Sequence, residues 1–551
     1  MKKKSFLLVC SLFFLISFQS LSQIIQPTDT LGHHQATQDQ YYDDSDLTLS
    51  QRVNNFFVPI VGAIGTVLFY DPFAALGIYD PVIYDELGQP ILNEAGEPVE
   101  KPIALVVVWL VLGAVFFTVY LKFINIKGFI HSIAIVRGKY DNPNDAGEVS
   151  HFQALATALS ATVGLGNIAG VAVAISLGGP GATVWMMMAG FLGMSLKFTE
   201  CTLGVKYRKV GPDGKISGGP MYYLRRGFEM RGAKRFGTFL AALFAVLVIG
   251  ASFGGGNMFQ SNQAFSQFQY VFPQAEGYGA LFGLCLALLV GLVVIGGIKG
   301  IARVTSKLVP FMALLYVGTA LYIIGVHFSH LGEVIRLIFS SAFGLEAMGG
   351  GFFGALFVGF QRGAFSNEAG IGSSPIVHAA ANTNEPVSEG MVALLEPFVD
   401  TVIVCTMTAL VLICTGFHVN PDGYEGTQLT AAAFGSVLPW FPYILVVCIF
   451  LFAFSTMISW SYYGLKGFNY LFGNLFLKYF GKPRASDLTF YILFLACIVI
   501  GSSSSLSTVI DFSDMMILGM AFPNIIGLIV MSGEVVRDLK CYLKRFSNGE
   551  V

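Results

Sequence analysis

Two short stretches place glycine and hydrogen-bonding side chains inside runs that are long enough to cross a membrane. The first is SATVGLGNIAG, Ser160 to Gly170, and the second is QRGAFSNEAGIGSSP, Gln361 to Pro375. Glycine in a helix interior costs about 1 kcal/mol relative to alanine, so both stretches are poor helix. In hydrocarbon, an unwound stretch persists only where it lines a polar cavity, and its freed amides and carbonyls then become ligands. Because helix amino ends attract a carboxylate and carbonyls attract a cation, two such breaks suit a zwitterion and a small ion.

Two other interpretations apply to the first stretch. Membrane helices also use glycine for close packing, and the first stretch alone is equally compatible with that use. A nucleotide-binding loop fits poorly, because the glycine spacing is G-x-G-x-x-x-G rather than G-x-G-x-x-G and no strand precedes it. The second stretch, with the same Gly, Ser and Asn content, favours a pair of breaks.

In the first break, Asn167 offers both an amide oxygen and an amide donor. We expect it to line the site, with Thr162, Gly164 and Gly166 beside it. The alternative is an asparagine that only caps a half-helix.

In the second break, Glu368 is the most informative residue, because a carboxylate inside a membrane is costly and marks a functional site by default. It would hold a substrate ammonium or carry a proton, and a structural pair is the alternative. Arg362 lies off its helical face and is expected to pair elsewhere. The remaining candidates in this break are Phe365, Ser366, Asn367, Gly370, Gly372 and Ser373.

A later stretch, FSTMISWSYYG, adds hydroxyls and an indole. Thr456 and Trp460 are four residues apart and share a helix face, as do Ser455 and Ser459. Hydroxyl oxygens suit sodium, and an indole wall limits the size of a bound side chain. A simple hydroxyl bond between helices is the alternative.

Other charged residues in apolar runs have simpler interpretations. Lys197 and Glu200, at i and i+3, are expected to form a salt bridge near the cytoplasmic end of a helix. Glu396 and Asp400, at i and i+4, repel each other unless one is protonated or faces water or a cation. His378 is expected to be a polar cap.

The elements that position these residues are apolar spans of about 20 residues. The sequence predicts eleven of them, at 103–124, 152–177, 181–205, 236–258, 278–297, 308–326, 352–379, 392–416, 440–463, 488–506 and 509–530. Each break opens a set of five spans. Because five is odd, the two sets enter the membrane from opposite sides, which is the outline of an inverted repeat with two discontinuous helices.

The composition agrees with a polytopic membrane protein of the all-α class. Of 551 residues, 54% are hydrophobic and only 12% are charged, and the mean hydropathy is +0.67. The formal net charge of −2 has no basic excess and gives no support for a nucleic-acid partner. Residues 1–22 have a basic start and a short apolar stretch, which predicts a cleaved signal peptide, followed by a periplasmic segment at 23–102.

The Lys and Arg residues predict the orientation, because cytoplasmic loops collect them. With the start of the first span outside, the inside loops carry 24 and the outside segments carry 3. The amino terminus is therefore expected in the periplasm of a bacterium-like cell, and the carboxyl-terminal tail, residues 534–551, in the cytoplasm. The localisation that follows is the inner membrane.

Six longer motifs extend this pattern from about Glu148 to Met531. They are FQALATALSATVGLGNIAGVA, GGPGATVW, KFTECTLGVKYR, SGGPMYYL, RGAFSNEAGIGSSPIVHAAA and STMISWSYYG. Together they resemble the alanine/glycine:cation symporter family, whose members take up small amino acids with sodium. The resemblance implies a leucine-transporter-like fold of two inverted five-helix repeats, here at 148–327 and 350–533, with one extra amino-terminal helix at 103–124. The long segment at 23–102 departs from the short amino terminus of that family.

The resemblance also implies roles for particular residues. Sodium would take carbonyl oxygens of Ser160 and Val163 and a hydroxyl of Ser455 or Thr456, while Thr456 and Trp460 would contact the substrate. No other cofactor is expected, and a monomer is slightly favoured. The function predicted is sodium-coupled symport of alanine or glycine by alternating access.

There are three alternatives to sodium symport, one of them also a transporter and two from other classes of membrane protein. A proton-coupled amino-acid transporter would use Glu368 as the proton carrier. A membrane-embedded enzyme would need a nucleophile, base or metal set, and no histidine pair has metal spacing. A channel would need a repeated pore ring rather than one asymmetric pair of repeats.

Overall fold

The structure is a computed structural model. It describes residues 65–66, 68–77, 80–82, 89–90, 92, 98, 103–142, 145–211, 214–343, 351–419, 423–424, 426–482, 484–503 and 506–549. The predicted signal peptide, residues 1–22, lies outside the described residues, as does most of the predicted periplasmic segment, residues 23–102.

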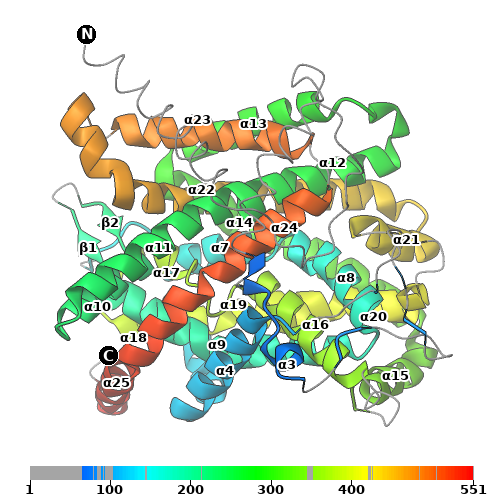
Figure 1. Ribbon diagram of the computed structural model, residues 1–551, viewed down its shortest axis with the longest axis horizontal. Helices are drawn as coiled ribbons and strands as arrows, with labels where there is room; N and C mark the ends of the chain where they lie inside the picture. Colours follow the sequence, from blue (N-terminus) through cyan, green and yellow to red (C-terminus); the bar gives the residue numbers. More distant parts are fainter. Residues whose placement is uncertain are drawn as a thin grey trace.

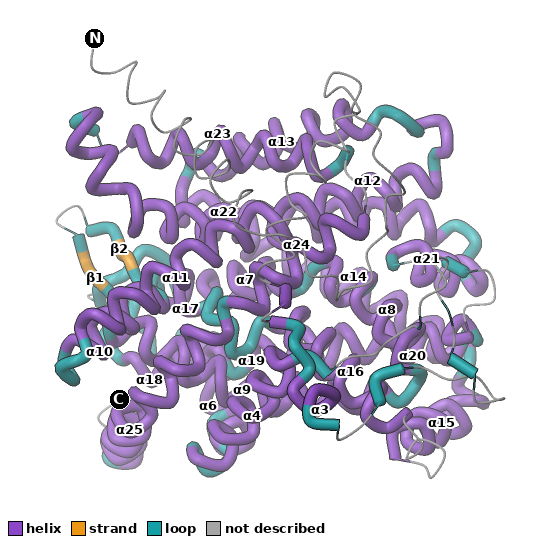
Figure 2. The backbone as a smooth tube through the Cα atoms, in the orientation of Figure 1, coloured by secondary structure: helices purple, strands orange, loops and turns teal. Residues whose placement is uncertain are grey.

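The described part of the chain is almost entirely helical (Figures 1 and 2). Its one regular sheet is a pair of two-residue antiparallel strands, β1 (Lys209–Val210) and β2 (Ile216–Ser217). Figure 2 shows these strands in orange at one edge of the molecule, beside α10 (Pro220–Glu229) and α11 (Lys234–Phe253). The all-helical class predicted from the composition is confirmed.

A first helix, α4 (Leu105–Tyr120), precedes two runs of helices in the predicted order. The first run is α7 (His151–Thr162) with η1 (Leu165–Asn167) and α8 (Ala169–Gly178), then α9 (Ala182–Lys206), α11 with η2 (Gly254–Met258) and α12 (Phe259–Val271), α13 (Gly279–Val294) and α14 (Gly297–Val326). The second run is α16 (Gly351–Asn367) with α17 (Pro375–His378), then α18 (Pro386–Ala393) with α19 (Leu395–Pro397), η6 (Phe398–Cys405) and α20 (Thr406–Cys414), then α22 (Phe441–Phe480), α23 (Arg484–Gly501), and α24 (Leu506–Gly519) with α25 (Ala521–Ser547).

Smaller elements connect these helices. They are α3 (Pro72–Ala75), α5 (Ile124–Lys127), α6 (Phe129–Val136), η3 (Pro273–Ala275), η4 (Phe328–His330), α15 (Leu331–Phe343), η7 (Phe417–Val419) and α21 (Thr427–Val437).

Several of the described helices are long and apolar enough to cross a membrane. Six meet this criterion singly, and α7 with α8 makes a seventh when the bent pair is taken as one span. The helices α4 and α13 are apolar but shorter, with 16 residues each. A helix lies over each of the eleven predicted spans, and the chain is a multi-pass membrane protein.

The first predicted break interrupts the span formed by α7 and α8. Ser150 begins α7 through a capping box, in which its hydroxyl accepts from the Gln153 amide and its own amide donates to the Gln153 side chain. The helix ends at Thr162, and the chain turns by 57° before it continues. Gly164 adopts φ −150° and ψ −147°, which is neither helix nor strand geometry, and glycine tolerates such backbone readily.

The second predicted break follows α16. The backbone turns left-handed at Glu368, with φ +56°, and again at Gly370 and Gly372, with φ +88° and +89°. Side chains rarely adopt this conformation, so the non-glycine residue Glu368 is held there by its surroundings. Both interruptions predicted from the Gly, Ser and Asn content are therefore confirmed.

Neighbouring helices enclose the two breaks. The helix α16 lies along α8 and α9, and α22 contacts α7, α11 and α12. The extra helix α4 lies outside this core against α9 and α25, where Thr118 donates a 3.2 Å hydrogen bond to the Leu192 carbonyl. In Figure 1, α13 and α23 lie side by side at the opposite edge of the molecule from α4.

Candidate functional site

The two breaks, about 200 residues apart in the sequence, touch each other in the core. A Cβ added to Gly166 would lie 3.5 Å from the Cα of Ser366, so glycine lets the first break approach the backbone of the second. Asn167 and Ser366 are 1% and 2% exposed. The junction is thus a buried polar region in the middle of an apolar protein.

Asp400 joins the two breaks. Asn167 Nδ2 donates to Asp400 Oδ1 at 2.7 Å and to the Asp400 carbonyl at 3.0 Å. Ser366 Oγ and Thr401 Oγ1 each donate to Asp400 Oδ2 at 2.8 Å. Both carboxylate oxygens therefore accept hydrogen bonds. Oδ1 accepts from Asn167 in the first break, and Oδ2 accepts from Ser366 in the second break.

The local backbone around Asp400 explains its position. Asp400 lies in η6, a wide π-helical segment that follows Pro397 and precedes the regular helix α20. Such insertions re-aim side chains and are frequent at functional sites. Asn367, the last residue of α16, also bonds this segment, through Nδ2 to Thr401 Oγ1 at 3.1 Å.

The charge of Asp400 has no basic partner. Within the described ranges, no Lys, Arg or His side chain forms an ion pair with this fully buried carboxylate. Burying a charge without an opposite charge costs free energy, and hydrogen bonds from neutral donors compensate for it only in part. A purely structural role therefore explains Asp400 poorly. The arrangement favours a site that receives a cation.

Asn167 caps the first break and also bonds Asp400. Its Oδ1 accepts a 2.8 Å hydrogen bond from the Gly164 amide, which caps the short turn η1, while its Nδ2 reaches Asp400. Thr408 on α20 binds the Asn167 carbonyl at 2.8 Å. The predicted neighbour Thr162 instead turns its hydroxyl toward its own helix, 3.4 Å from the carbonyls of Ala158 and Leu159.

A second oxygen-rich group lies where α7 meets α22. Ser160 Oγ donates to the Ser455 carbonyl at 2.6 Å, and Thr456 Oγ1 donates to the Ser160 carbonyl at 3.0 Å. Ser455 Oγ lies 3.0 Å from the carbonyl of Phe452. Next to them, Val163 leaves α7 with extended backbone. The structure therefore brings together three of the residues for which a sodium site was predicted, Ser160, Ser455 and Thr456.

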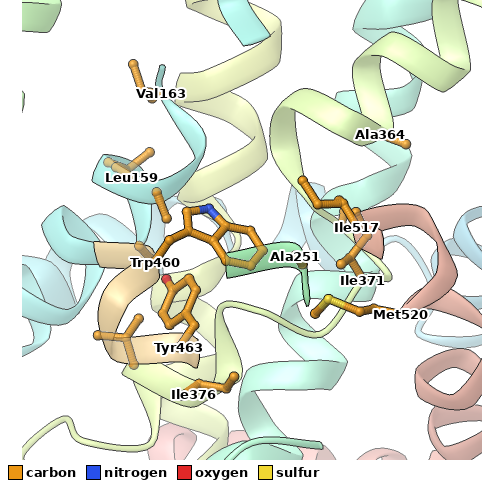
Figure 3. Close-up of a cluster of buried hydrophobic side chains, with 14 of the residues drawn as sticks. Leu159, Val163, Ala251, Ala364, Ile371, Ile376, Trp460, Tyr463, Ile517 and Met520 are labelled. Carbon is orange, nitrogen blue, oxygen red and sulfur yellow. The ribbon is translucent and has the colours of Figure 1, made fainter. Parts of the chain in front are cut away.

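Glu368 and Trp460, two residues that were predicted separately for the site, meet in the structure. Trp460 Nε1 donates to Glu368 Oε1 at 3.2 Å, and Ser373 Oγ donates to Glu368 Oε2. Gly256 in η2 lies directly against the indole, where any larger residue would collide with it. Figure 3 shows Trp460 and Tyr463 within a cluster of buried apolar side chains; their rings are 5.3 Å apart and edge-to-face.

The predicted salt bridge between Lys197 and Glu200 is wrong. Lys197 Nζ instead forms a 2.9 Å ion pair with Glu396 Oε1, and Glu200 Oε1 accepts a 2.5 Å hydrogen bond from the Gly370 amide. Both residues face the protein interior because α9 is enclosed by α16 and α18. Glu200 therefore bonds the Gly370 amide, which the second break leaves free, instead of pairing with Lys197.

Other sequence-based expectations have definite outcomes. The expected repulsion between Glu396 and Asp400 is relieved, since Glu396 pairs with Lys197 and Asp400 accepts from neutral donors. Arg362 pairs with Asp514, at 3.4 Å, as expected of a residue that does not face Glu368. His378 does not cap a helix end but binds Glu389 through Nδ1 at 2.5 Å.

The remaining predicted residues lie around the junction. Phe365 makes an edge-to-face contact with Phe259, with ring centroids 6.1 Å apart. The Gly370 carbonyl accepts a 2.8 Å hydrogen bond from Asn524 Nδ2, whose side-chain oxygen accepts from Tyr223. Ser459, on the face of Ser455, is fully buried.

Sequence reasoning did not include Asp400, Glu200 or Asn524 in the site. The signal for the two carboxylates was present, because each is an acid inside an apolar run. Asn524 carried no comparable signal, since an isolated amide in a helix is compatible with many roles. In the described part of the chain, no group of three or more His, Cys, Asp or Glu residues is arranged to hold a metal ion.

Several known proteins are similar to this chain in sequence. The model of the sodium:alanine symporter family matches residues 86–551. The chain is 38% identical over 459 residues to the sodium/alanine symporter AgcS of Methanococcus maripaludis, covering 82% of this chain and 96% of that one. It is 34% identical to the probable sodium/glutamine symporter GlnT of Bacillus subtilis, covering 81% and 89%.

A third relative is the putative sodium/proton-dependent alanine carrier protein YrbD of Bacillus subtilis, which is 35% identical and is covered over 90% of its length. Among solved structures, MhsT in complex with L-phenylalanine superposes with a TM-score of 0.47 at 15% identity, covering 71% of this chain and 99% of that one.

Proposed function

The chain belongs to the sodium:alanine symporter family, and from this premise we propose that it carries small neutral amino acids into the cytoplasm together with sodium. The observation that carries the proposal is the junction of the two breaks at Asp400. There, a buried carboxylate that has no basic partner among the described residues lies beside freed backbone groups of both discontinuous helices. Alanine is the expected substrate, with glycine as a second one.

The sodium ion is assigned to the oxygen group between α7 and α22. Its ligands are the carbonyls of Ser160 and Val163 and the hydroxyls of Ser455 and Thr456. Two hydrogen bonds between these segments support the assignment, because they hold the Ser160 carbonyl 3.0 Å from Thr456 Oγ1. Hard cations prefer such oxygen ligands.

The amino acid is assigned to the space bordered by the two breaks and α22. The residues proposed to border it are Thr162, Gly164, Gly166, Asn167, Phe365, Ser366, Asn367, Glu368, Gly370, Thr456 and Trp460, to which the structure adds Asp400. Helix ends and freed amides would receive the carboxylate. Asp400 would supply the negative charge for the cationic part of the cargo, and the indole of Trp460 would limit side-chain size.

The chain organisation follows the same proposal. Two inverted repeats at 148–327 and 350–533 would rock against each other to expose the site to each side in turn. The 24-to-3 distribution of Lys and Arg supports an inner-membrane protein with a periplasmic amino terminus after signal cleavage and a cytoplasmic tail.

The test of the site is Asp400→Asn, which removes the charge and keeps the shape. Hydrogen bonds to charged groups contribute about 1.5–3 kcal/mol, so we expect the sodium or alanine concentration for half-maximal uptake to rise by roughly 10- to 150-fold. Ser366→Ala is the variant for comparison, because it removes one hydrogen bond to Asp400 and leaves the charge, so its effect should be smaller. If purified Asp400→Asn has the uptake kinetics of wild type, Asp400 is not part of the site.

A further inference from the structure

Six titratable side chains form an unbroken string that runs from the protein surface to the second break. Each member bears the opposite kind of charge to the next. In order they are Asp141, His151, Glu389, His378, Glu396 and Lys197. Nothing in the proposed transport site uses the two histidines or Glu389, so the string requires its own explanation.

The geometry of the string is defined by its two histidines. His151 Nε2 lies 3.8 Å from Asp141 Oδ1, and its Nδ1 binds Glu389 Oε2. His378 Nδ1 lies 2.5 Å from Glu389 Oε1, and its Nε2 lies 3.6 Å from Glu396 Oε2. Each imidazole thus has a carboxylate near both of its nitrogens. The two Nδ1 contacts are hydrogen bonds, whereas the two Nε2 contacts are longer ionic contacts, and among the described residues His378 Nε2 has no hydrogen-bond partner.

This arrangement fits charged histidines better than neutral ones. A neutral imidazole has one N–H, so its other nitrogen would turn a lone pair toward a carboxylate, whereas an imidazolium donates at both nitrogens. With both histidines protonated, three negative and three positive charges balance. If one histidine loses its proton, a buried negative charge is left without compensation.

The string joins elements of both broken spans. His151 is the first residue of α7, His378 the last of α17, Glu389 lies on α18, Glu396 on α19, and Lys197 on α9. All are buried except Asp141, whose side chain is 47% exposed. Because buried ion pairs add little stability relative to apolar packing, this string is better explained as a switch than as a support.

Backbone bonds close the same end of the molecule. The segment before α7 pairs with the segment after α17, through Glu148 N to the Ala380 carbonyl and Asn382 N to the Val149 carbonyl, both at 2.8 Å. Arg208 then donates to carbonyls on both segments, at 2.6 Å to Ala146 and 2.8 Å to Ala381. By the Lys and Arg distribution, this end faces the cytoplasm.

We propose that the string is a cytoplasmic proton-binding site that controls opening of the transporter toward the cytoplasm. The proposal rests on the transport function proposed above. Protonated histidines hold α7, α17 and α18 together and keep this end closed. Loss of a proton to the cytoplasm leaves the string with excess negative charge, so α17 and α18 separate more readily from α7 and α9. Alkaline conditions on this side therefore favour the open state.

Other ionisable groups face the string and set its electrostatic background. From α9 and the residues after it come Glu200, Cys201 and Arg208, and from α22 comes Tyr463; the second break contributes Glu368 and the loop before α7 contributes Asp145. From α6 and α25, His131 and Tyr542 bind each other at 2.8 Å rather than the string. Because carboxylates flank both histidines of the string and favour their protonated form, we expect these histidines to titrate above neutral pH.

The protein contains a native probe of this opening. Cys201 is fully buried on α9, one helical turn beyond Lys197, on the helix that α17 and α18 cover. Cys541 on α25 is exposed and serves as the reference. Two full-length proteins are made in which all other cysteines are replaced, one retaining Cys201 and one retaining Cys541.

The experiment measures the rate of N-ethylmaleimide labelling of each protein at about pH 7 and about pH 9.5, a range that brackets the titration of histidines whose charged form is stabilised by carboxylates. The ratio of the Cys201 rate to the Cys541 rate corrects for the common effect of pH on thiols. We expect this ratio to rise with pH, by up to about tenfold per unit for one proton. In His378→Gln and His151→Gln, the ratio should be high at both pH values. The matched control, His131→Gln, should retain the wild-type profile.

A wild-type ratio that does not change with pH would overturn the proposal, and so would a rise that persists in both glutamine variants. If His378→Gln does not fold, the proposal is tested by comparing the wild-type protein with His151→Gln, which lies toward the exposed end of the string. Sodium-dependent alanine uptake by the wild-type protein is measured in parallel. Normal uptake with pH-independent labelling refutes only the string, whereas absent uptake refutes the transport function and leaves the labelling result standing.

Discussion

Replacing Thr456 with valine tests the proposed sodium site most sharply. The substitution keeps a β-branched side chain and removes the hydroxyl that donates to the Ser160 carbonyl at 3.0 Å. Thr456 is 1% exposed and Ser160 is fully buried, so water does not readily replace the lost group. Both the ion and the carbonyl then lack a partner in a region that excludes solvent.

The expected magnitude follows from this burial. Leaving a buried polar group unsatisfied costs about 1–3 kcal/mol. If that cost falls on the sodium-bound state, the sodium concentration for half-maximal alanine uptake rises by roughly 5- to 150-fold. Thr456→Ser retains the hydroxyl and should remain within about threefold of wild type, because it loses only a methyl group.

A second substitution, at Gly164, should displace the same Thr456 hydroxyl. A Cβ at Gly164 would lie 2.7 Å from Thr456 Oγ1, closer than van der Waals contact allows, so Gly164→Ala must displace the hydroxyl or the break. Gly170→Ala is its matched control, because a Cβ at Gly170 would meet no atom within 4 Å. We expect weakened sodium dependence in the first variant and wild-type behaviour in the second.

The assay is the initial rate of radiolabelled alanine uptake into proteoliposomes over a series of external sodium concentrations. If Thr456→Val shows the sodium dependence of wild type, the site is wrongly placed. If the serine variant, which keeps the hydroxyl, is as impaired as the valine variant, the loss does not follow the oxygen, and the reasoning is refuted in a different way.

Two further predictions concern selectivity and orientation. Trp460→Ala removes the indole that is proposed to limit substrate size, so valine and leucine should compete with alanine uptake roughly 10-fold better or more, since a pocket discriminates by about 1–3 kcal/mol per methylene. Sodium coupling should survive. A variant that transports alanine well yet still excludes larger amino acids would show that Trp460 is structural. In a cysteine-free background, an impermeant thiol reagent applied to intact cells should label Gly96→Cys and not Gly214→Cys; the reverse pattern would invert the proposed topology.

The breaks themselves could be predicted because their chemistry is local. Three glycines within seven residues, or Gly370 and Gly372 beside Ser and Asn, are poor helix material wherever the chain places them. The apolar spans around them are equally local, since about 20 residues cross a bilayer. For this reason, the order of helices in the structure follows the order predicted from the sequence.

The partners of the charged residues could not be predicted in this way. Asn167 and Asp400 are 233 positions apart, and only the tertiary fold brings them together. Lys197 and Glu200 illustrate the converse error, because their spacing suits a salt bridge on an exposed helix, whereas α9 is buried and offers each residue a better partner. Helical spacing identifies a shared face but does not specify which residues pack against it.

Uptake driven by a sodium gradient tests the central claim most directly. Proteoliposomes containing the purified wild-type protein are given radiolabelled alanine with an inward sodium gradient, or with an inward proton gradient in sodium-free buffer. The account predicts accumulation of alanine above its external concentration with the sodium gradient, and only background uptake with the proton gradient alone. Equal accumulation in the sodium-free proton gradient would contradict the account.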